Sequence, residues 1–143
     1  AFDSFNSQIL PESEEDMAWK VGNTGFAMKL SAYVPRIINE NLEDILGQIL
    51  SKAGKSLKDI DIWAVHPGGK AILEKIEEAL SLPKSEFQVS YDVLREYGNM
   101  SSVTIMFVLE RILADEREGN LLAIAFGPGL TVETGFLRKI RKP

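Results

Sequence analysis

Hydrophobic residues recur every three or four positions in two long stretches of the chain, which predicts two amphipathic helices. We expect the first helix to begin at Pro35 and to end near Gly54, with apolar positions at Ile37, Ile38, Leu42, Ile45, Leu46, Ile49 and Leu50. We expect the second to end before Pro83, with apolar positions at Ile72, Leu73, Ile76, Ala79 and Leu80. Proline suits the first turn of a helix and glycine its end, so these boundaries agree with the periodicity.

A third helical stretch, Ser102–Leu113, is apolar around the whole helix axis instead of along one side. Its apolar residues are Val103, Ile105, Met106, Phe107, Val108, Leu109, Ile112 and Leu113. A helix that is apolar on every side is a buried one, so we predict a central helix covered on several faces. A short helix over Tyr91–Tyr97, ending at Gly98, is expected to precede it.

Short apolar or alternating runs predict strands between these helices. The expected strands are residues 2–9, Ile60–Val65, Leu121–Phe126 and Leu130–Ile140, the last of them at an edge of the sheet. A hairpin is predicted from Met17–Val21 and Thr24–Leu30, which flank a turn at Gly22–Asn23. Because strands alternate with helices, the fold class is α/β: one domain over residues 1–143, with a mixed, mostly parallel sheet and helices packed on both sides.

Composition excludes several kinds of site. Lys and Arg number 16 against 21 Asp and Glu, and this net charge of −5 argues against a nucleic-acid binder. The chain has no Cys and one His, which excludes disulfides, thiolate or multi-histidine metal sites and a Cys nucleophile from this chain. No apolar run approaches the length of a membrane span and no signal segment opens the chain, so we expect a cytoplasmic protein without membrane contact.

Two charge clusters lie toward the ends of the chain, and we interpret both as solvated surface. The acidic cluster, Glu12, Glu14, Glu15 and Asp16, belongs to an expected loop over Pro11–Asp16. The basic cluster is Arg138, Lys139, Arg141 and Lys142. The chain opens at Ala1 directly within an expected strand, as a piece cut from a longer protein would.

The single histidine, His66, stands between a buried type of strand and the start of a helix. The residues after it, Pro67-Gly68-Gly69, include two glycines that let the backbone approach a ligand closely. Free amides at the helix start are also suited to an anion or a polarised oxygen. On the pattern alone, a structural histidine at a strand end explains the residue equally well.

Two further loops carry polar or glycine-rich residues at strand and helix ends, where ligands gather in α/β sheets. Asn99 follows Gly98, which permits a positive φ, and either Ser101 or Ser102 is suited to cap the next helix. The loop Phe126-Gly127-Pro128-Gly129 joins two strands, and its glycine spacing is not a dinucleotide fingerprint. Taken singly, both loops are better explained as turns than as parts of a site.

Taken together, the three loops resemble the C-terminal half of the chalcone synthase-like enzymes, the type III polyketide synthases, which have a thiolase fold. The segments that match, in order and at the family's spacing, are Trp63–Gly69, Glu96–Ser102 and Phe126–Glu133. The Pro-Gly-Gly after His66, and Met100 after Asn99, favour this family over the ketoacyl synthases that initiate fatty acids.

The resemblance implies that His66 and Asn99 are catalytic and donate hydrogen bonds to the thioester carbonyl of malonyl-CoA as carbon dioxide leaves. His66 would also stabilise the thiolate of a catalytic cysteine. Met17 stands near a wall position that is small in chalcone-forming relatives, so we expect it to affect starter choice or chain length. The other residues implied in substrate or CoA binding are Ala71, through its backbone, Phe26, as a gate, and Ser101, Phe126, Gly127 and Pro128, along the pocket.

The resemblance implies partners as well. The substrates are acyl-CoA and malonyl-CoA, with no metal and no bound cofactor. The cysteine nucleophile belongs to an N-terminal half that this chain lacks, so we expect no condensation by the chain alone. The full-length protein is expected to be a homodimer through that half, and the uncovered flank of Ser102–Leu113 would promote association of the isolated fragment.

Two alternatives stay open on the sequence. The chain would keep the same fold as a non-catalytic module that binds CoA or a protein partner. The chain would also have this fold as half of a ketoacyl synthase III-like enzyme, whose acyl groups are delivered by acyl carrier protein instead of CoA.

Overall fold

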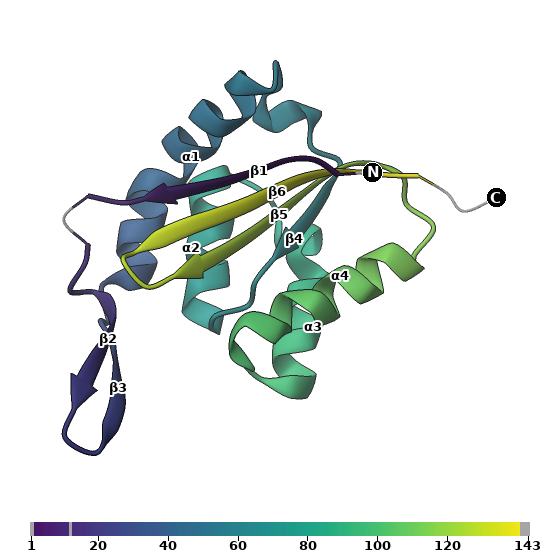
Figure 1. Cartoon of the computed structure of the whole chain (residues 1–143). Helices are drawn as coiled ribbons and strands as arrows, with labels where there is room; N and C mark the ends of the chain where they lie inside the picture. The colour runs from purple at the N-terminus through teal and green to yellow at the C-terminus, as the bar shows by residue number, and fades with distance from the viewer. Residues whose placement is uncertain (1, 12, 141–143) are drawn as a thin grey trace.

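A four-stranded sheet forms the centre of the molecule in a computed structural model that describes residues 2–11 and 13–140 (Figure 1). The strands, in spatial order, are β1 (Phe2–Ile9), β6 (Thr131–Lys139), β5 (Gly119–Gly127) and β4 (Ile62–Val65). β4 and β5 pair in parallel, whereas β6 is antiparallel to both β5 and β1. The predicted mixed sheet is confirmed, but its mostly parallel character is wrong, because β4–β5 is the one parallel pairing in the described sheet.

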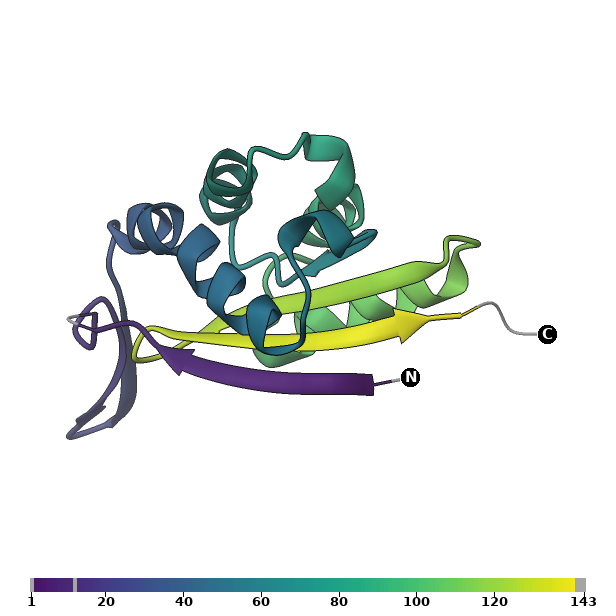
Figure 2. The ribbon, with the colours of Figure 1, turned by 90° about the horizontal axis from the view of Figure 1, so that it is seen from above.

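The last strand, β6, lies inside the sheet, so its predicted edge position is wrong. β1 is the outer strand on that side, and it pairs with β6 from Ile9 opposite Thr131 to Phe2 opposite Leu137 (Figure 2). β6 is covered on both faces at its middle, since the successive residues Thr134, Gly135 and Phe136, which alternate between the two faces, are all buried. The alternation within a strand indicates which side chains face inward, but it does not say which strands lie beside it.

Helices cover both faces of the sheet, as predicted. They are α1 (Val34–Lys52), α2 (Lys70–Leu80), α3 (Gln88–Tyr97) and α4 (Thr104–Ala114). The apolar stripes of α1 and α2, including Leu46 and Leu73, form one core with Leu122 of β5. On the opposite face, Val108 of α4 packs in a second core with Leu121.

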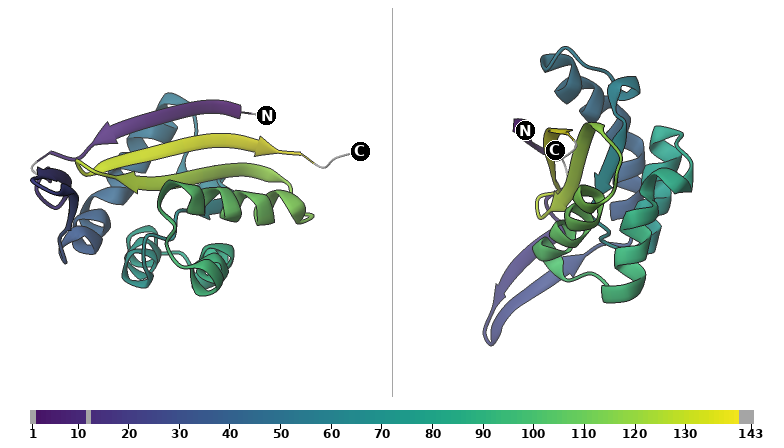
Figure 3. Two further views of the ribbon diagram at one scale, coloured as in Figure 1. Left: turned by 60° about the horizontal axis from the view of Figure 1, so that its bottom comes forward. Right: turned by 90° about the vertical axis from the view of Figure 1, so that its right-hand side faces the viewer.

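Within the described residues, α4 is buried along one side only, so the prediction of a helix covered on several faces needs correction. Thr104, Val108 and Ile112 are fully buried, whereas Met106 and Leu113 are each 59% exposed. α4 runs along β5, whereas β6 and β1 lie on the far side of β5 from this helix (Figure 3, left). The sequence encodes an apolar surface around the whole helix, but the described part of the chain covers just one side of it.

The predicted hairpin projects from the body of the molecule as a separate two-stranded ribbon (Figure 3, right). Its strands are β2 (Met17–Gly22) and β3 (Gly25–Leu30), and because Gly22 pairs with Gly25 the turn lies one residue later than predicted. One face of the ribbon is apolar and consists of the cross-strand pairs Met17–Leu30, Trp19–Met28 and Val21–Phe26. The other face carries Lys20 and Lys29, which both pair with Glu15.

The other predicted boundaries lie within three residues of the observed ones. Three short 3₁₀ turns complete the fold: Leu57–Asp59, Lys84–Phe87 and Ser101–Val103. Of the two charge clusters, Glu12, Arg141 and Lys142 lie outside the described residues, as does Ala1.

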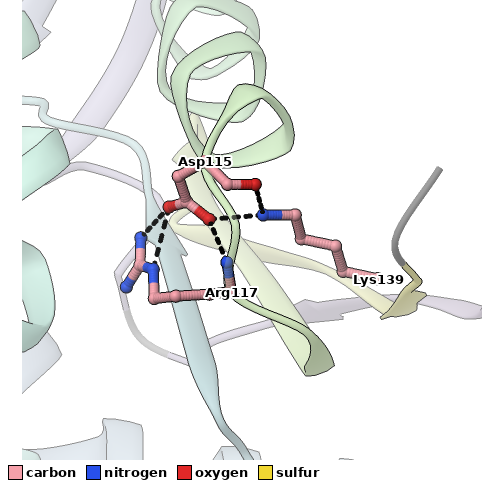
Figure 4. A network of polar contacts seen from close by, with 3 residues as sticks. All are labelled: Asp115, Arg117 and Lys139. Carbon is pink, nitrogen blue, oxygen red and sulfur yellow. Dashed lines mark hydrogen bonds and ion pairs between the residues drawn. The ribbon is translucent and has the colours of Figure 1, made fainter.

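Lys139 is not solvated surface as predicted, but the buried member of a polar network (Figure 4). Its Nζ donates to the backbone carbonyl of Asp115 at 2.7 Å and pairs with the Asp115 carboxylate, which also accepts from Arg117 Nη2 at 2.6 Å. Burial raises the pKa of Asp115, but the hydrogen bonds from Arg117 and Lys139 outweigh that effect and lower it to about 2. The network joins the end of α4 to the end of β6.

We expect Asp115→Asn to lower the free energy of unfolding by about 1–2 kcal/mol at pH 7, since the carboxylate is partly exposed and solvent screens it. The pKa of Asp115 in the fold lies below the value of ~3.9 in an unfolded chain, so its stabilisation is complete above about pH 4. The stabilisation is lost as the pH falls toward about 2. Urea unfolding of both proteins at pH 7 and between pH 4 and 2.5 measures the difference.

The matched control for this change is Asp92→Asn, which removes an ion pair with Arg95 on the surface of α3. It should shift stability by less than about 0.5 kcal/mol. If the difference between Asp115→Asn and the unchanged chain stayed constant from pH 7 to pH 2.5, the ionised carboxylate of Asp115 would contribute no stability.

Candidate functional site

A cavity of about 650 Å³ opens where β4 and β5 end. The residues of all three candidate loops reach it, together with the base of the β2–β3 ribbon and the start of α1. Seven of the predicted site residues line the cavity: Met17, His66, Asn99, Ser101, Phe126, Gly127 and Pro128. The structure therefore brings residues from four separate segments of the chain to one site.

His66 is held at the end of β4 by backbone hydrogen bonds. Its N–H donates to the carbonyl of Ile124 at 2.8 Å, and its carbonyl accepts from the N–H of Gly68 at 2.9 Å. A Cβ on Gly68 would lie 3.0 Å from Ile72 Cδ1 and 3.7 Å from the His66 ring, so glycine lets the chain pass beside the imidazole. Burial lowers the pKa of His66, and a neutral imidazole offers one N–H donor.

Asn99 joins its own loop to that of His66. Its Nδ2 donates to the carbonyl of Gly68 at 3.0 Å, and its Oδ1 accepts from the N–H of Ser101 at 2.9 Å. These two bonds fix the orientation of the amide, because exchanging its oxygen and nitrogen would break both. The bond to Gly68 uses one of the two amide N–H groups, so the other is available to a ligand in the cavity.

Thr104, the first residue of α4, anchors the Asn99 loop and was not predicted from the sequence. Its buried Oγ1 accepts from the N–H of Met100 at 2.8 Å and donates to the carbonyl of Ser101 at 2.8 Å. The prediction that Ser101 or Ser102 caps this helix is wrong, because the side-chain bonds come from Thr104 instead. Gly98 has the positive φ that was predicted, and Ser101 has one as well.

Two predicted site residues lie outside the cavity lining. Phe26 is close to the tip of the ribbon and 73% exposed, because the ribbon extends beyond the cavity. Ala71 is exposed on the first turn of α2. Neither residue touches the cavity in this chain, so their roles at the gate and in CoA binding stay predictions.

Apolar side chains that the sequence analysis did not single out form most of the cavity wall. They are Trp19, Met28 and Leu30 from the ribbon, Val34 and Ile72 from α1 and α2, and Ile105 from α4. The strand alternation could have identified the ribbon residues, since they share a face with Met17. Glu133 is the one carboxylate in the lining, and no Lys or Arg of the described residues joins it.

No group of three or more His, Asp or Glu side chains within residues 2–11 and 13–140 is arranged to hold a metal ion. No helix of this part is both long and apolar enough to cross a membrane.

Comparison with known proteins agrees with this geometry. The family described as chalcone and stilbene synthases, C-terminal domain, matches residues 2–141. A relative named type III polyketide synthase B, from Arabidopsis thaliana, is 39% identical over 87% of this chain and 35% of its own length. Pks18 of Mycobacterium tuberculosis, named an alpha-pyrone synthesis polyketide synthase-like protein, is 34% identical over 95% of this chain and 36% of its own length.

Two solved structures have the same fold over 98% of the chain. PKS-I of the brown alga Ectocarpus siliculosus matches with a TM-score of 0.88 and 32% identity, over 39% of its own chain. The C-terminal type III polyketide synthase domain of Steely1, a type I/III hybrid from Dictyostelium, matches with a TM-score of 0.89 and 30% identity, over 40% of its chain. The present chain thus spans 35% to 40% of the length of these four proteins.

Proposed function

This chain belongs to the chalcone and stilbene synthase family, as the C-terminal domain of a type III polyketide synthase, and from that premise we propose how it contributes to catalysis. In the full-length enzyme it supplies the His66–Asn99 pair that decarboxylates malonyl-CoA and condenses it with an acyl-CoA starter. The observation that supports this most directly is the Asn99–Gly68 hydrogen bond, which fixes two potential donors at one cavity.

The proposed mechanism follows from where negative charge develops. Malonyl-CoA binds with its thioester oxygen toward His66 and Asn99. As its terminal carbon–carbon bond breaks, carbon dioxide leaves and the bonding electrons move to the thioester oxygen, giving an enolate. Each fixed N–H donor aimed at that oxygen stabilises the transition state by about 3–4 kcal/mol. The enolate carbon then attacks the carbonyl carbon of an acyl thioester held on the cysteine of the N-terminal half. The new carbon–carbon bond forms as the carbon–sulfur bond breaks, and the cysteine leaves as a thiolate.

The residues of the cavity wall favour binding of an acyl chain inside the cavity and of the CoA phosphates outside it. The wall is apolar except for His66, Asn99, two serines and Glu133, and no cation of the described residues lines it. Such a wall suits a neutral acyl chain, because an unpaired phosphate would lose its hydration there. The exposed Ala71 and Phe26 are then contacts at the cavity mouth. The electrons of the new carbon–carbon bond come from the bond that breaks in decarboxylation, so the proposed reaction needs no metal and no bound cofactor.

We place the missing N-terminal half against the uncovered side of α4. A groove of about 370 Å³ runs between α4 and the outer strands, lined by Phe5, Ile105, Leu109, Ala123 and Gly135, among others. Together with the exposed Met106 and Leu113 it forms an apolar surface of the kind that is covered in an intact protein. That half would carry the cysteine and the homodimer contacts, so the isolated chain should not condense substrates and should associate through this surface.

The test of this function is an assay of the full-length protein with malonyl-CoA and a panel of acyl-CoA starters. Release of carbon dioxide together with a polyketide product is the expected result. Turnover with acyl carrier protein thioesters but not with CoA thioesters would indicate a ketoacyl synthase instead. CoA binding without turnover, in a protein that has no catalytic cysteine, would indicate a binding module.

Met17 is expected to limit cavity volume in this enzyme. It lies at the base of the ribbon, opposite Leu30, and its side chain lines the cavity. Met17→Gly should therefore change the ratio of products by about tenfold, toward bulkier starters or more extensions. Chromatography of the products from a mixed starter panel measures that ratio.

Val21→Gly is the matched control, because it makes the same kind of change in the same strand at a residue that is 81% exposed and outside the lining. It should leave the product ratio unchanged. An unchanged ratio in Met17→Gly as well would show that Met17 has no part in selectivity.

A further inference from the structure

The hydroxyl of Ser13 is buried at a junction of the cavity wall with the sheet. The residue is 1% exposed, and its Oγ lies 2.7 Å from the carbonyl oxygen of Leu10 and 2.8 Å from the backbone nitrogen of Leu130. The hydroxyl donates its single hydrogen to Leu10 and accepts from the N–H of Leu130. The carbonyl oxygen of Gly129 lies slightly farther away, at 3.2 Å.

These contacts replace one bond of the β1–β6 ladder. Two residues of a closely bonded antiparallel pair exchange two N–H···O bonds. Leu10 and Leu130 continue the register of Ile9 opposite Thr131, and they exchange one such bond directly, from the Leu10 N–H to the Leu130 carbonyl at 2.9 Å. The second bond is not direct, since the Ser13 hydroxyl stands between the Leu130 N–H and the Leu10 carbonyl. The serine is thus a polar wedge between two strand ends.

The wedge lies where two walls of the cavity meet. Leu130 ends the turn that contains Gly127 and Pro128, both of which line the cavity. The N–H of Gly129 in this turn donates to the carbonyl of Met17 at 2.9 Å, which fastens the turn to the base of the ribbon. The loop between Ser13 and the ribbon is itself held by a bond from the Asp16 N–H to the Ser13 carbonyl at 3.0 Å.

A buried hydroxyl at this place has a specific consequence for the turn. An apolar side chain of similar size would fill the same space beside Leu10 and Leu130, which are themselves buried. It would leave the Leu130 N–H without an acceptor, and a buried unpaired donor is unfavourable. The turn would relieve this by closing toward β1 or by opening to water, and either movement displaces Gly127 and Pro128 relative to Met17.

From this geometry we propose that Ser13 is a positioning residue for the polyketide reaction. Its hydroxyl sets the separation of the Gly127–Pro128 wall from the Met17 wall, and so the shape of the space in which the chain grows and cyclises. The inference rests on the function proposed above. Ser13 touches no reacting atom, because the contacts that carry the inference are with backbone atoms of Leu10, Leu130 and Gly129.

Its first test compares Ser13→Ala with Ser13→Thr in the full-length enzyme. Ser13→Ala should shift the ratio of products by about tenfold, while release of carbon dioxide from malonyl-CoA per folded enzyme stays within about twofold. Ser13→Thr keeps the hydroxyl and should restore the original ratio. Ile49→Val is the control for stability alone, because Ile49 is buried in α1 and outside the cavity lining.

A merely structural role predicts a different result. Carbon dioxide release and all products per total enzyme would then fall together in Ser13→Ala, as expected for Ile49→Val, and the ratio of products would not change. That outcome, or failure of Ser13→Thr to restore the ratio, would overturn the proposal.

A second measurement does not depend on the reaction. Amide hydrogen exchange at Leu130 should become at least about tenfold faster in Ser13→Ala, whereas exchange at the core strand residue Ile124 should not change. Equal exchange at Leu130 in both proteins would mean that the hydroxyl does not hold the wall. If the unchanged enzyme makes no polyketide but Leu130 exchange responds, the proposed function fails and the wedge stands.

Discussion

Replacing His66 with alanine in the full-length enzyme should lower kcat for condensation by at least about 10²–10³-fold, the cost of losing one oxyanion donor. His66 is the only histidine of the chain, and it is 8% exposed at the wall of the cavity. Because burial lowers its pKa, the imidazole of this half is neutral at pH 7 and would donate a hydrogen bond without carrying charge. In the full-length protein, a cysteine thiolate of the N-terminal half would favour protonation of His66 and so form a thiolate–imidazolium pair.

Two readouts separate these roles of His66. Release of carbon dioxide from malonyl-CoA reports the oxyanion donor, and the rate of cysteine alkylation at pH 7 reports the stabilised thiolate. Both should fall in His66→Ala. His66→Gln keeps an N–H donor near the cavity and should recover part of the carbon dioxide release but not the alkylation rate. Unchanged turnover in His66→Ala would make this residue structural and would overturn its proposed catalytic role.

Replacing Asn99 with alanine is expected to lower carbon dioxide release by about 10²–10³-fold, again the loss of one donor. The change also removes the link between the loops of His66 and Asn99, because the Asn99 amide forms hydrogen bonds with both the Gly68 carbonyl and the Ser101 N–H. Asn99→Asp is the more informative variant. It keeps an acceptor for Ser101 but turns the donor into a carboxylate, which faces the Gly68 carbonyl and repels an enolate. We therefore expect Asn99→Asp to be no more active than Asn99→Ala.

Asn39→Ala is the matched control for Asn99. The Asn39 amide donates to the carbonyl of Lys75 at 3.1 Å and so joins α1 to α2, away from the cavity lining. It removes the same kind of long-range bond and should leave carbon dioxide release within about twofold of the unchanged enzyme. Equal losses in Asn39→Ala and Asn99→Ala would mean that Asn99 acts through stability alone.

The helices and strands were predictable because their signal is local. The spacing of Ile38, Leu42 and Leu46 places them on one side of α1, where all three are buried. The loops of His66 and Asn99 were also correctly located, since they follow from the ends of predicted elements. Their approach to one another was implied by the resemblance, not by their spacing, and the Asn99–Gly68 bond now accounts for it.

The wrong predictions for β6 and Lys139 have one cause. Both concern features that depend on contacts between distant parts of the chain. β6 was predicted at an edge, but β1 from the opposite end of the chain covers it. Lys139 was interpreted as solvated because it lies among other cations. Its ammonium group instead contacts the backbone carbonyl and the carboxylate of Asp115, and these contacts permit the burial of the lysine.

The α/β class, the amphipathic faces of α1 and α2, and the polar residues at strand and helix ends could all be predicted from the amino-acid sequence alone. Periodicity and turn chemistry act over a few residues, so a single stretch of chain contains the whole signal. The burial of Ser13, within an acidic loop that was expected to be solvated, could be seen only in the folded structure. Its partner Leu130 lies 117 positions away, and no local pattern records which buried donor a distant hydroxyl will meet.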